Sequence, residues 1–272
     1  MSPIEYKKIK KLYNPIWIRK EVLILLNRNQ LKITMLVVMT LDHIAPFITP
    51  ELSTFFHALT RCVAVFFGYM LVEGFHYTRN QKTYIYRLYG WALLMFLGNT
   101  LLNHFSESSV QIHNNIFLTL AVGASLLYLI TLIQTAISLQ KKVLLSILFL
   151  LLLVSGLLTE GGIVVLPFIL ITYFTKGSWF KRDILYLVFA LILLLLFDLP
   201  PILQSQTNRE FWLNFGFNSS WLFISVIPIL HLYNGEKGSS SPWTKHLFYI
   251  YYPLHLWGIT FLARLLEFST QS

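Results

Sequence analysis

The chain has 272 residues, of which 56% are hydrophobic and only 12% are charged, and its mean hydropathy is +0.62. A soluble domain is about a quarter charged, so this chain has too few polar side chains to cover a water-facing surface. The composition therefore predicts an integral membrane protein. The net charge of +9 does not indicate a nucleic-acid partner, because Lys and Arg are confined to particular loops, as in oriented membrane proteins.

Residues 1–30 form the first predicted unit, a basic segment in which seven Lys and Arg residues alternate with apolar and aromatic ones. This mixture is typical of an amphipathic segment that lies in the headgroup region of an anionic leaflet. We expect it to anchor and orient the chain.

Nine apolar segments follow, and a helix needs about 20 apolar residues to cross a bilayer. The segments are 31–48, 54–76, 84–103, 115–137, 142–158, 160–176, 183–203, 216–233 and 246–266. They predict an all-α polytopic membrane protein with about nine transmembrane helices in one domain, residues 31–268. The fifth and sixth segments are short and meet at Glu160 and two glycines, so they are either two full spans or two half-helices.

The loops between these segments differ sharply in charge. Loops on the amino-terminal side carry Arg79, Lys82, Arg87, Lys141, Lys142, Lys176, Lys181, Arg182, Lys237 and Lys245, whereas the opposite loops carry only Arg209. Positive residues collect on the cytoplasmic side of membranes. We therefore expect a cytoplasmic amino terminus and, with an odd number of spans, an extracytoplasmic carboxyl terminus.

The first two apolar segments contain most of the candidate chemistry. Asp42 and His43 are adjacent in the first, Arg61 lies in the second, and Glu73 is near the end of the second. An ionisable side chain at membrane depth costs about 2.5–3.5 kcal/mol on insertion scales and usually faces a cavity or a partner. This helical hairpin is therefore the predicted active site.

Other polar residues fall into two groups by expected depth. Glu160, Asp198, Tyr252 and His255 are placed with Asp42 and Arg61 in the outer half or near the middle of the membrane. Glu73, Arg79 and Arg87 are placed at the cytoplasmic end, where the planar fork of arginine suits a phosphorylated ligand. The histidines are too scattered to predict a metal site.

Several sequence pieces together resemble the TraX family of membrane proteins, which is named for the acetylation of a conjugative pilin. They are L-K-x-x-x-x-V-x-M-x-x-D-H-I from Leu31, R-C-V-A-x-F-F-x-x-x-L-V-E-G-F-x-x-T-R-N from Arg61, the Tyr84/Arg87 pair, the stretch from Asn115 to Gly123, E-G-G at Glu160, and Y-Y-P-L-H-L from Tyr251. The arrangement is also similar to the multi-span acyltransferases that take acyl groups from cytosolic acyl-CoA. One departure is Glu160, where the family often has Asp.

The resemblance implies a bacterial plasma-membrane acetyltransferase that uses acetyl-CoA and modifies an amine or hydroxyl of an extracytoplasmic or membrane peptide, lipid or glycan. On this view His43 is the general base, because the ordinary pKa of histidine, about 6.5, suits proton transfer at neutral pH. Asp42 is expected to pair with Arg61 or with His255, since adjacent helical residues do not face each other. The candidates are His43 and Asp42 for catalysis, Arg61, Glu73, Arg79 and Arg87 for the donor, and Asn115, Glu160, Asp198, Tyr252 and His255 for the acceptor.

Two other functional classes remain open from the sequence. A proton-coupled transporter also uses intramembrane acids and bases, although such transporters more often contain internal repeats. A non-catalytic membrane component of a conjugation or secretion apparatus would not need Asp42, His43 and Arg61.

Overall fold

The computed structural model describes residues 25–104, 111–238 and 242–271, and all the regular elements in these ranges are helices. They are α2 (Arg28–His43), α3 (Pro50–Tyr77), α4 (Gln81–His104), α5 (Ile116–Thr135), α6 (Leu139–Leu157), α7 (Gly162–Phe174), α8 (Trp179–Leu193), the π-helical segment η3 (Leu194–Asp198), α9 (Leu199–Leu203), α10 (Asn208–Phe217), the 3₁₀ segment η4 (Ser220–Ser225), α11 (Val226–Leu232) and α12 (Pro242–Gln271), with a short 3₁₀ turn at Ala45–Phe47. The all-α prediction is confirmed for this part of the chain. Most of the predicted segment 1–30 lies outside it.

Polar side chains set where the helices begin. The Asn27 side chain accepts hydrogen bonds from the first turn of α2 while Gln30 reaches back to the backbone N–H of Asn27, which completes a capping box. Thr49 caps α3 directly before Pro50, a residue suited to the first helical position. Ser138 and Ser178 cap α6 and α8 in the same way.

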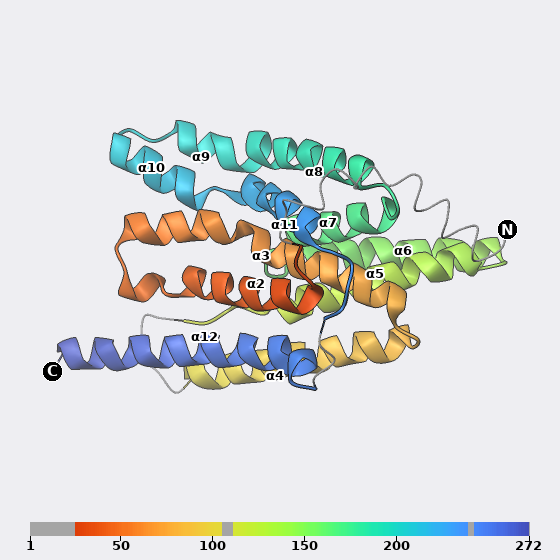
Figure 1. The fold of residues 1–272 in the computed structure, drawn as a ribbon, viewed down its shortest axis with the longest axis horizontal. Helices are drawn as coiled ribbons and strands as arrows, with labels where there is room; N and C mark the ends of the chain where they lie inside the picture. Colours follow the sequence, from red (N-terminus) through yellow and green to blue (C-terminus); the bar gives the residue numbers. More distant parts are fainter. Residues whose placement is uncertain (1–24, 105–110, 239–241, 272) are drawn as a thin grey trace.

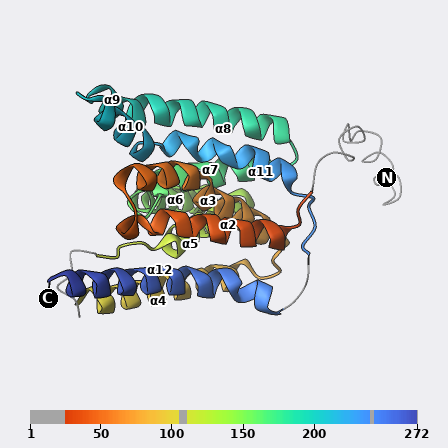
Figure 2. The same cartoon turned by 60° about the vertical axis from the view of Figure 1, so that its left-hand side comes forward.

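The helices run roughly along the long axis of the molecule (Figure 1). A view turned by 60° separates α8–α11 on one side, α4 and α12 on the other, and a middle group that contains α2, α3, α6 and α7 (Figure 2). Helix α3 is central because it packs against α2, α5, α7, α10 and η4. Any side chain on the inner faces of α3 is thus surrounded by several other elements.

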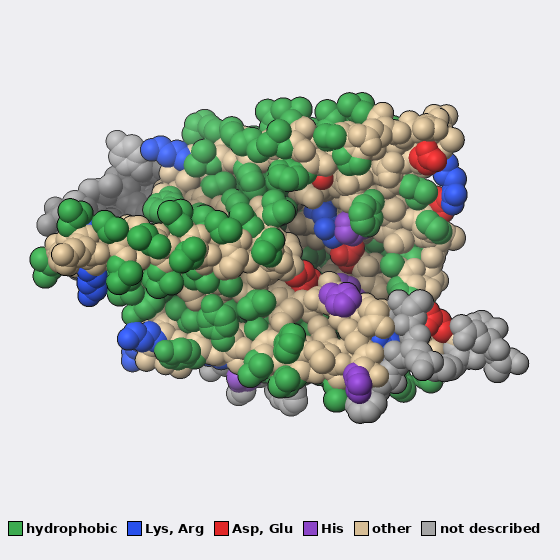
Figure 3. Space-filling model, turned by 180° about the vertical axis from the view of Figure 1, so that it is seen from behind, with side chains coloured by type: hydrophobic (Ala, Val, Ile, Leu, Met, Phe, Trp, Pro, Cys, Tyr) green, Lys and Arg blue, Asp and Glu red, His purple; other side chains and the backbone are tan. Residues whose placement is uncertain are grey.

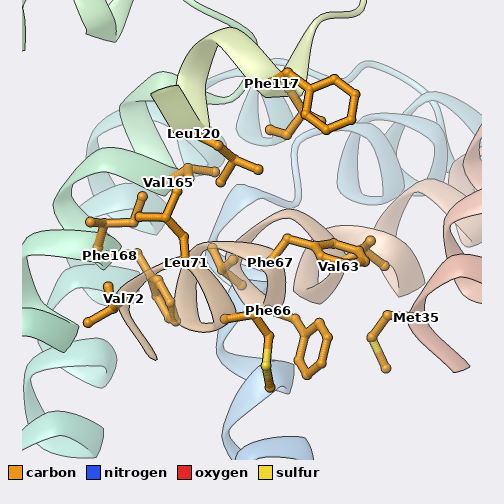
Figure 4. Packing of buried hydrophobic residues seen from close by; sticks show 14 of the residues in the cluster. Met35, Val63, Phe66, Phe67, Leu71, Val72, Phe117, Leu120, Val165 and Phe168 are labelled. Carbon is orange, nitrogen blue, oxygen red and sulfur yellow. The ribbon is translucent and has the colours of Figure 1, made fainter. Parts of the chain in front are cut away.

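The core around α3 is apolar and aromatic. Phe66, Phe67 and Leu71 of α3 meet Phe117 of α5 and Phe168 of α7 in the main buried cluster (Figure 4). Helix α2 adds one face, consisting of Leu31, Met35, Leu36 and Met39. The close packing of this core fixes the rotation of α2 and α3, and hence where their polar residues point.

All nine predicted apolar segments are helical, but the count of nine spans needs correction. Four helices are long and apolar enough to cross a membrane among the described residues: α3, α5, α6 and the run Trp179–Leu203. A fifth candidate is the pair Asn208–Phe217 and Ser220–Leu232, which is bent by 52°. Helices α2 and α7 are too short, with only 16 and 13 residues. Helices α4 and α12 are long enough, but they contain Tyr, Asn, Arg and His residues that lower their mean hydropathy.

The loops predicted to be basic collect toward one end of the bundle. The α3–α4, α5–α6 and α7–α8 connections lie toward the end at which α2 begins, and the carboxyl terminus lies toward the opposite end (Figure 1). The charge asymmetry seen in the sequence is therefore an asymmetry of the folded molecule.

Candidate functional site

A cavity of about 280 Å³ lies between α2, α3, α12 and the turn that joins α6 to α7. We call it the central cavity. Its polar lining includes Asp42, His43, His57, Arg61, Asn114, Glu160 and Tyr252, and its apolar lining includes Met39, Val63, Val65, Phe67, Val164, Val165 and Phe248. From the side shown in Figure 3, acidic, basic and histidine side chains gather in a depression on a largely apolar face.

Asp42 connects two side chains of α3. One carboxylate oxygen is 2.9 Å from Nδ1 of His57, and the other accepts a hydrogen bond of 2.9 Å from Nη2 of Arg61. Arg61 also donates from Nε to the carbonyl oxygen of His57 at 2.8 Å. Of the two partners predicted for Asp42, Arg61 and His255, the structure shows Arg61, and both residues line the central cavity.

His43 points to a different partner. Its ring centroid is 5.1 Å from that of His255 on α12, and within the described residues its nitrogens make no hydrogen bond. Nδ1 of His255 donates to the carbonyl oxygen of Tyr251 at 2.9 Å, while Nε2 of His255 is buried without a partner. His43 lines the central cavity with ring nitrogens that no other described residue occupies, and a general base requires such a free nitrogen.

Glu160 is held on the opposite wall by two donors. Asn114 Nδ2 donates to Oε1 at 2.9 Å, and the Tyr252 hydroxyl donates to Oε2 at 3.0 Å. The backbone N–H of Ile116 in turn donates to the Tyr252 oxygen at 3.2 Å. Glu160, Tyr252 and the start of α5 therefore form one hydrogen-bonded unit, although they are far apart in sequence.

The turn that carries Glu160 requires its glycines. Gly161 has φ of +64°, a left-handed conformation that side chains disfavour. A Cβ at Gly162 would collide with the backbone carbonyl of Gly156 on α6. Thr119 on α5 donates to the carbonyl oxygen of Glu160 at 2.7 Å, so the turn is tied to the bundle and lines the central cavity.

The remaining candidates occupy other places. Asn115 caps α5 and donates to the carbonyl oxygen of Ala92, and it lines a separate cavity of about 310 Å³. Asp198 is buried and accepts from the backbone N–H of Trp221 at 2.9 Å, outside the central cavity lining. Glu73 lines a third cavity at the basic end.

The two predicted phosphate-binding arginines are exposed. Arg87 covers the rings of Tyr84 and Tyr249, at 5.4 and 5.6 Å from their centroids, and Arg79 lies beyond the end of α3. Neither lines the central cavity or the cavity that contains Glu73.

Among the polar residues named above in the central cavity lining, His57 and Asn114 were not predicted as site residues. His57 lies four positions before Arg61, so the two share a helical face, and this spacing was a usable signal. Asn114 precedes α5 in an irregular connection, and nothing in its local sequence indicates a contact with Glu160. Among the described residues, no group of three or more His, Cys, Asp or Glu side chains is placed to hold a metal ion.

Chemically, the central cavity combines a free imidazole, a guanidinium fixed by a carboxylate, and apolar walls. Arg61 uses Nε and Nη2 for His57 and Asp42, which leaves Nη1 as a donor for a bound group. A fixed donor near a base in an apolar site is suited to stabilising an oxyanion.

Comparisons with known proteins agree on one family. Residues 27–263 match the protein family described as TraX protein. The chain is also 26% identical over 244 residues to the probable fimbrial assembly protein FimC, serogroup H1, of Dichelobacter nodosus, which covers 84% of this chain and 91% of that protein. No solved structure matches the chain.

Proposed function

The chain belongs to the TraX protein family, and from that premise and the central cavity we propose that it is an integral membrane acyltransferase. The proposed reaction moves acetyl from cytosolic acetyl-CoA to an amine or hydroxyl of an extracytoplasmic or membrane peptide, lipid or glycan. The observation that carries the proposal is the meeting of His43, Asp42 and Arg61 in one cavity with apolar walls.

His43 acts as the base in the proposed mechanism. It takes a proton from the attacking N–H or O–H group, and the freed electron pair forms a bond to the thioester carbonyl carbon. The carbonyl oxygen becomes an oxyanion, which Arg61 stabilises through its remaining N–H donors. When the intermediate collapses, the C–S bond breaks and the leaving thiolate takes the proton from the imidazolium of His43.

Asp42 fixes this arrangement without contacting the substrate. It holds Arg61 at 2.9 Å and His57 at 2.9 Å, so both α3 side chains keep one orientation. His57 offers a second imidazole beside a carboxylate, and it is the competing candidate for the base. Glu160, Tyr252 and Asn114 form the wall on which the acceptor is placed.

The proposed setting is the bacterial plasma membrane, with the basic end in the cytoplasm. Acetyl-CoA then approaches from the end that carries the basic loops, and the carboxyl terminus lies outside. The apolar helices and the positive loops at one end support this orientation.

The decisive test replaces the proposed base. His43→Ala is expected to abolish acetyl gain in lipids, surface glycans and membrane peptides, measured by mass spectrometry of cells with and without the protein. His246→Ala removes an exposed histidine of α12 and should behave as wild type. Full acetylation by correctly inserted His43→Ala protein would reject His43 as the base, and loss in His57→Ala alone would assign that role to His57.

A second function has one specific observation in its favour. The relative from Dichelobacter nodosus is named a probable fimbrial assembly protein, which is compatible with a non-catalytic component of an assembly apparatus. If fimbrial or pilus assembly depends on the chain but is unchanged in the His43→Ala and Asp42→Asn variants, this second function is favoured over the enzyme.

A further inference from the structure

The cavity that contains Glu73, of about 260 Å³, lies at the basic end of the bundle between α3, α7 and α8. We call it the basic-end cavity. Its lining consists of Tyr69, Val72, Glu73 and His76 of α3, Thr172 of α7, Thr175, Lys176, Gly177 and Ser178 of the α7–α8 turn, and Trp179 and Arg182 of α8. None of these residues takes part in the acetyl transfer proposed for the central cavity.

Two cations line this cavity, and they are held differently. The Arg182 guanidinium pairs with Asp183 at 2.8 Å and lies 5.8 Å from the centroid of the Tyr69 ring, so its position is fixed. Lys176 makes no ion pair in the described part of the chain, and its Nζ lies 5.9 Å from the Tyr77 ring centroid. Lys176 therefore supplies the positive charge that a bound anion would meet.

The backbone adds to this charge. Gly177 has φ of +92°, which turns the chain sharply into α8, and Ser178 caps that helix. The first N–H groups of a helix have no partner within the helix, so they can donate hydrogen bonds to a phosphate bound at its N-terminus. Lys176 and the start of α8 thus face the same cavity.

The rest of the lining suits a nucleoside. Trp179 and Tyr69 present aromatic rings, against which a purine base can stack. Glu73 can accept hydrogen bonds from amino or hydroxyl groups, and within the described residues it forms no ion pair with Lys176. A cavity for inorganic phosphate alone would need neither the aromatic rings nor the carboxylate.

The basic-end and central cavities share the same two helices. Val164 and Val165 of α7 line the central cavity, whereas Thr172 and Thr175 line the other. Along α3, Arg61 and Glu73 are 12 residues apart, about 18 Å at 1.5 Å per residue. This separation is comparable with the extended pantetheine arm of coenzyme A.

We propose that the basic-end cavity binds the phosphates and base of coenzyme A, with Lys176 and the start of α8 on the phosphates and Trp179 on the adenine. The pantetheine arm then follows the contact between α3 and α7 to Arg61. Gly68 of α3 lies on this path, and a Cβ added there would be 3.2 Å from Ile169 of α7. The two helices are therefore in close contact at Gly68 and must move apart to admit the arm. This inference rests on the proposed acyltransferase function, and it assigns the phosphates to Lys176 and not to Arg79 or Arg87.

The test measures binding to the purified full-length protein in detergent by isothermal titration calorimetry. Coenzyme A and adenosine 3′,5′-bisphosphate are both expected to bind. A hydrogen bond to a charged group contributes about 1.5–3 kcal/mol, so Lys176→Gln should weaken both by about tenfold or more. Lys82→Gln removes an exposed lysine from the same end and should bind as wild type. Quenching of tryptophan fluorescence by adenosine 3′,5′-bisphosphate should disappear in Trp179→Phe.

The phosphate of a lipid headgroup could bind the same residues, so a second experiment compares coenzyme A with an anionic lipid. Protein in phosphatidylcholine nanodiscs, with and without phosphatidylglycerol, is titrated with coenzyme A. The inference is overturned if Lys176→Gln binds coenzyme A as tightly as wild type, or if phosphatidylglycerol displaces it completely at this site.

The binding results also separate this inference from the proposed function. Lys176-dependent binding of coenzyme A without acetyl transfer would retain the site and reject the enzyme. Acetyl transfer that is insensitive to Lys176→Gln, in kcat and in the KM for acetyl-CoA, would retain the enzyme and reject the site.

Discussion

Asp42 determines the charge balance of the central cavity. Its two oxygens bind His57 and Arg61, and its side chain is 23% exposed. If Asp42 is removed, the Arg61 guanidinium stays partly buried in the cavity without its anion. The free energy of unfolding then falls by more than the contribution of the lost hydrogen bond. The same change frees Arg61 and His57 to adopt other rotamers.

We therefore predict strong coupling between Asp42 and Arg61 in a double-mutant cycle. Asp42→Asn and Arg61→Gln should each destabilise the protein, and the double variant should lose less than their sum, with a coupling free energy of about 1–3 kcal/mol. The measurement is unfolding in detergent, followed by circular dichroism. Both single variants should also lose acetyl transfer.

The matched control is the exposed ion pair between Arg209 and Glu51, whose side chains are 69% and 56% exposed. Water and salt screen such a pair, so its coupling should be much weaker. Equal coupling in the two cycles would contradict the special role of the Asp42–Arg61 pair.

At the scale of elements, a glycine decides how closely α4 approaches α12. A Cβ at Gly98 would lie 2.8 Å from Cη2 of Trp257, and the indole is held because Nε1 donates to Asn99 Oδ1 at 2.9 Å. Asn99 in turn donates to the carbonyl oxygen of Asn114, which holds Glu160. The α4–α12 contact thus supports the Asn114 and Glu160 wall of the central cavity.

Gly98→Ala is predicted to destabilise the protein by about 1–3 kcal/mol, because the added methyl group overpacks a fixed indole. Gly90→Ala provides the control on the same helix, since a Cβ there meets nothing within 4 Å. Alanine is the better helix former, so Gly90→Ala should stabilise by up to about 1 kcal/mol. Thermal unfolding in detergent measures both, and similar shifts in the two variants would reject the packing argument.

For the molecule as a whole, the charge asymmetry of the loops predicts how the protein is oriented in the membrane. Lys237 lies in the exposed connection before α12, at the basic end, and Gln206 lies in the exposed connection after α9, toward the opposite end. Positively charged loops are retained in the cytoplasm. Helices α6 and α8 expose many large apolar side chains, as do α4 and α12, and we expect these surfaces to face lipid.

The orientation can be tested by labelling single cysteines in intact cells. Cys62 is the one native cysteine and is replaced first, after which Gln206→Cys and Lys237→Cys are made separately. A membrane-impermeant maleimide should label position 206 in intact cells and position 237 only after the cells are opened. The reverse pattern would place the basic end outside.

The amino-acid sequence alone is enough to predict a membrane protein, an all-helical fold and a difference in loop charge between the two ends of the bundle. These follow from composition, from the apolar segments and from loop charge, all of which are local properties. It also predicted that Asp42 pairs with Arg61 or with His255, because a charge within an apolar segment needs a partner, and the structure selects Arg61. The number of spans was the weakest prediction, because helix length and bending depend on neighbouring elements. Helix α2 ends at His43 after 16 residues, and the chain bends by 52° between α10 and the run Ser220–Leu232.

Only the tertiary structure decided which residues share a cavity. Helix rotation, set by core packing, brings His57 to Asp42 and His255 to His43, and it sends Arg87 to the outside. The turn between α6 and α7 brings Glu160 to Asn114 and Tyr252, which are 46 and 92 residues away in sequence. Such contacts depend on how nine apolar segments pack against one another, and no local pattern of residues contains that information.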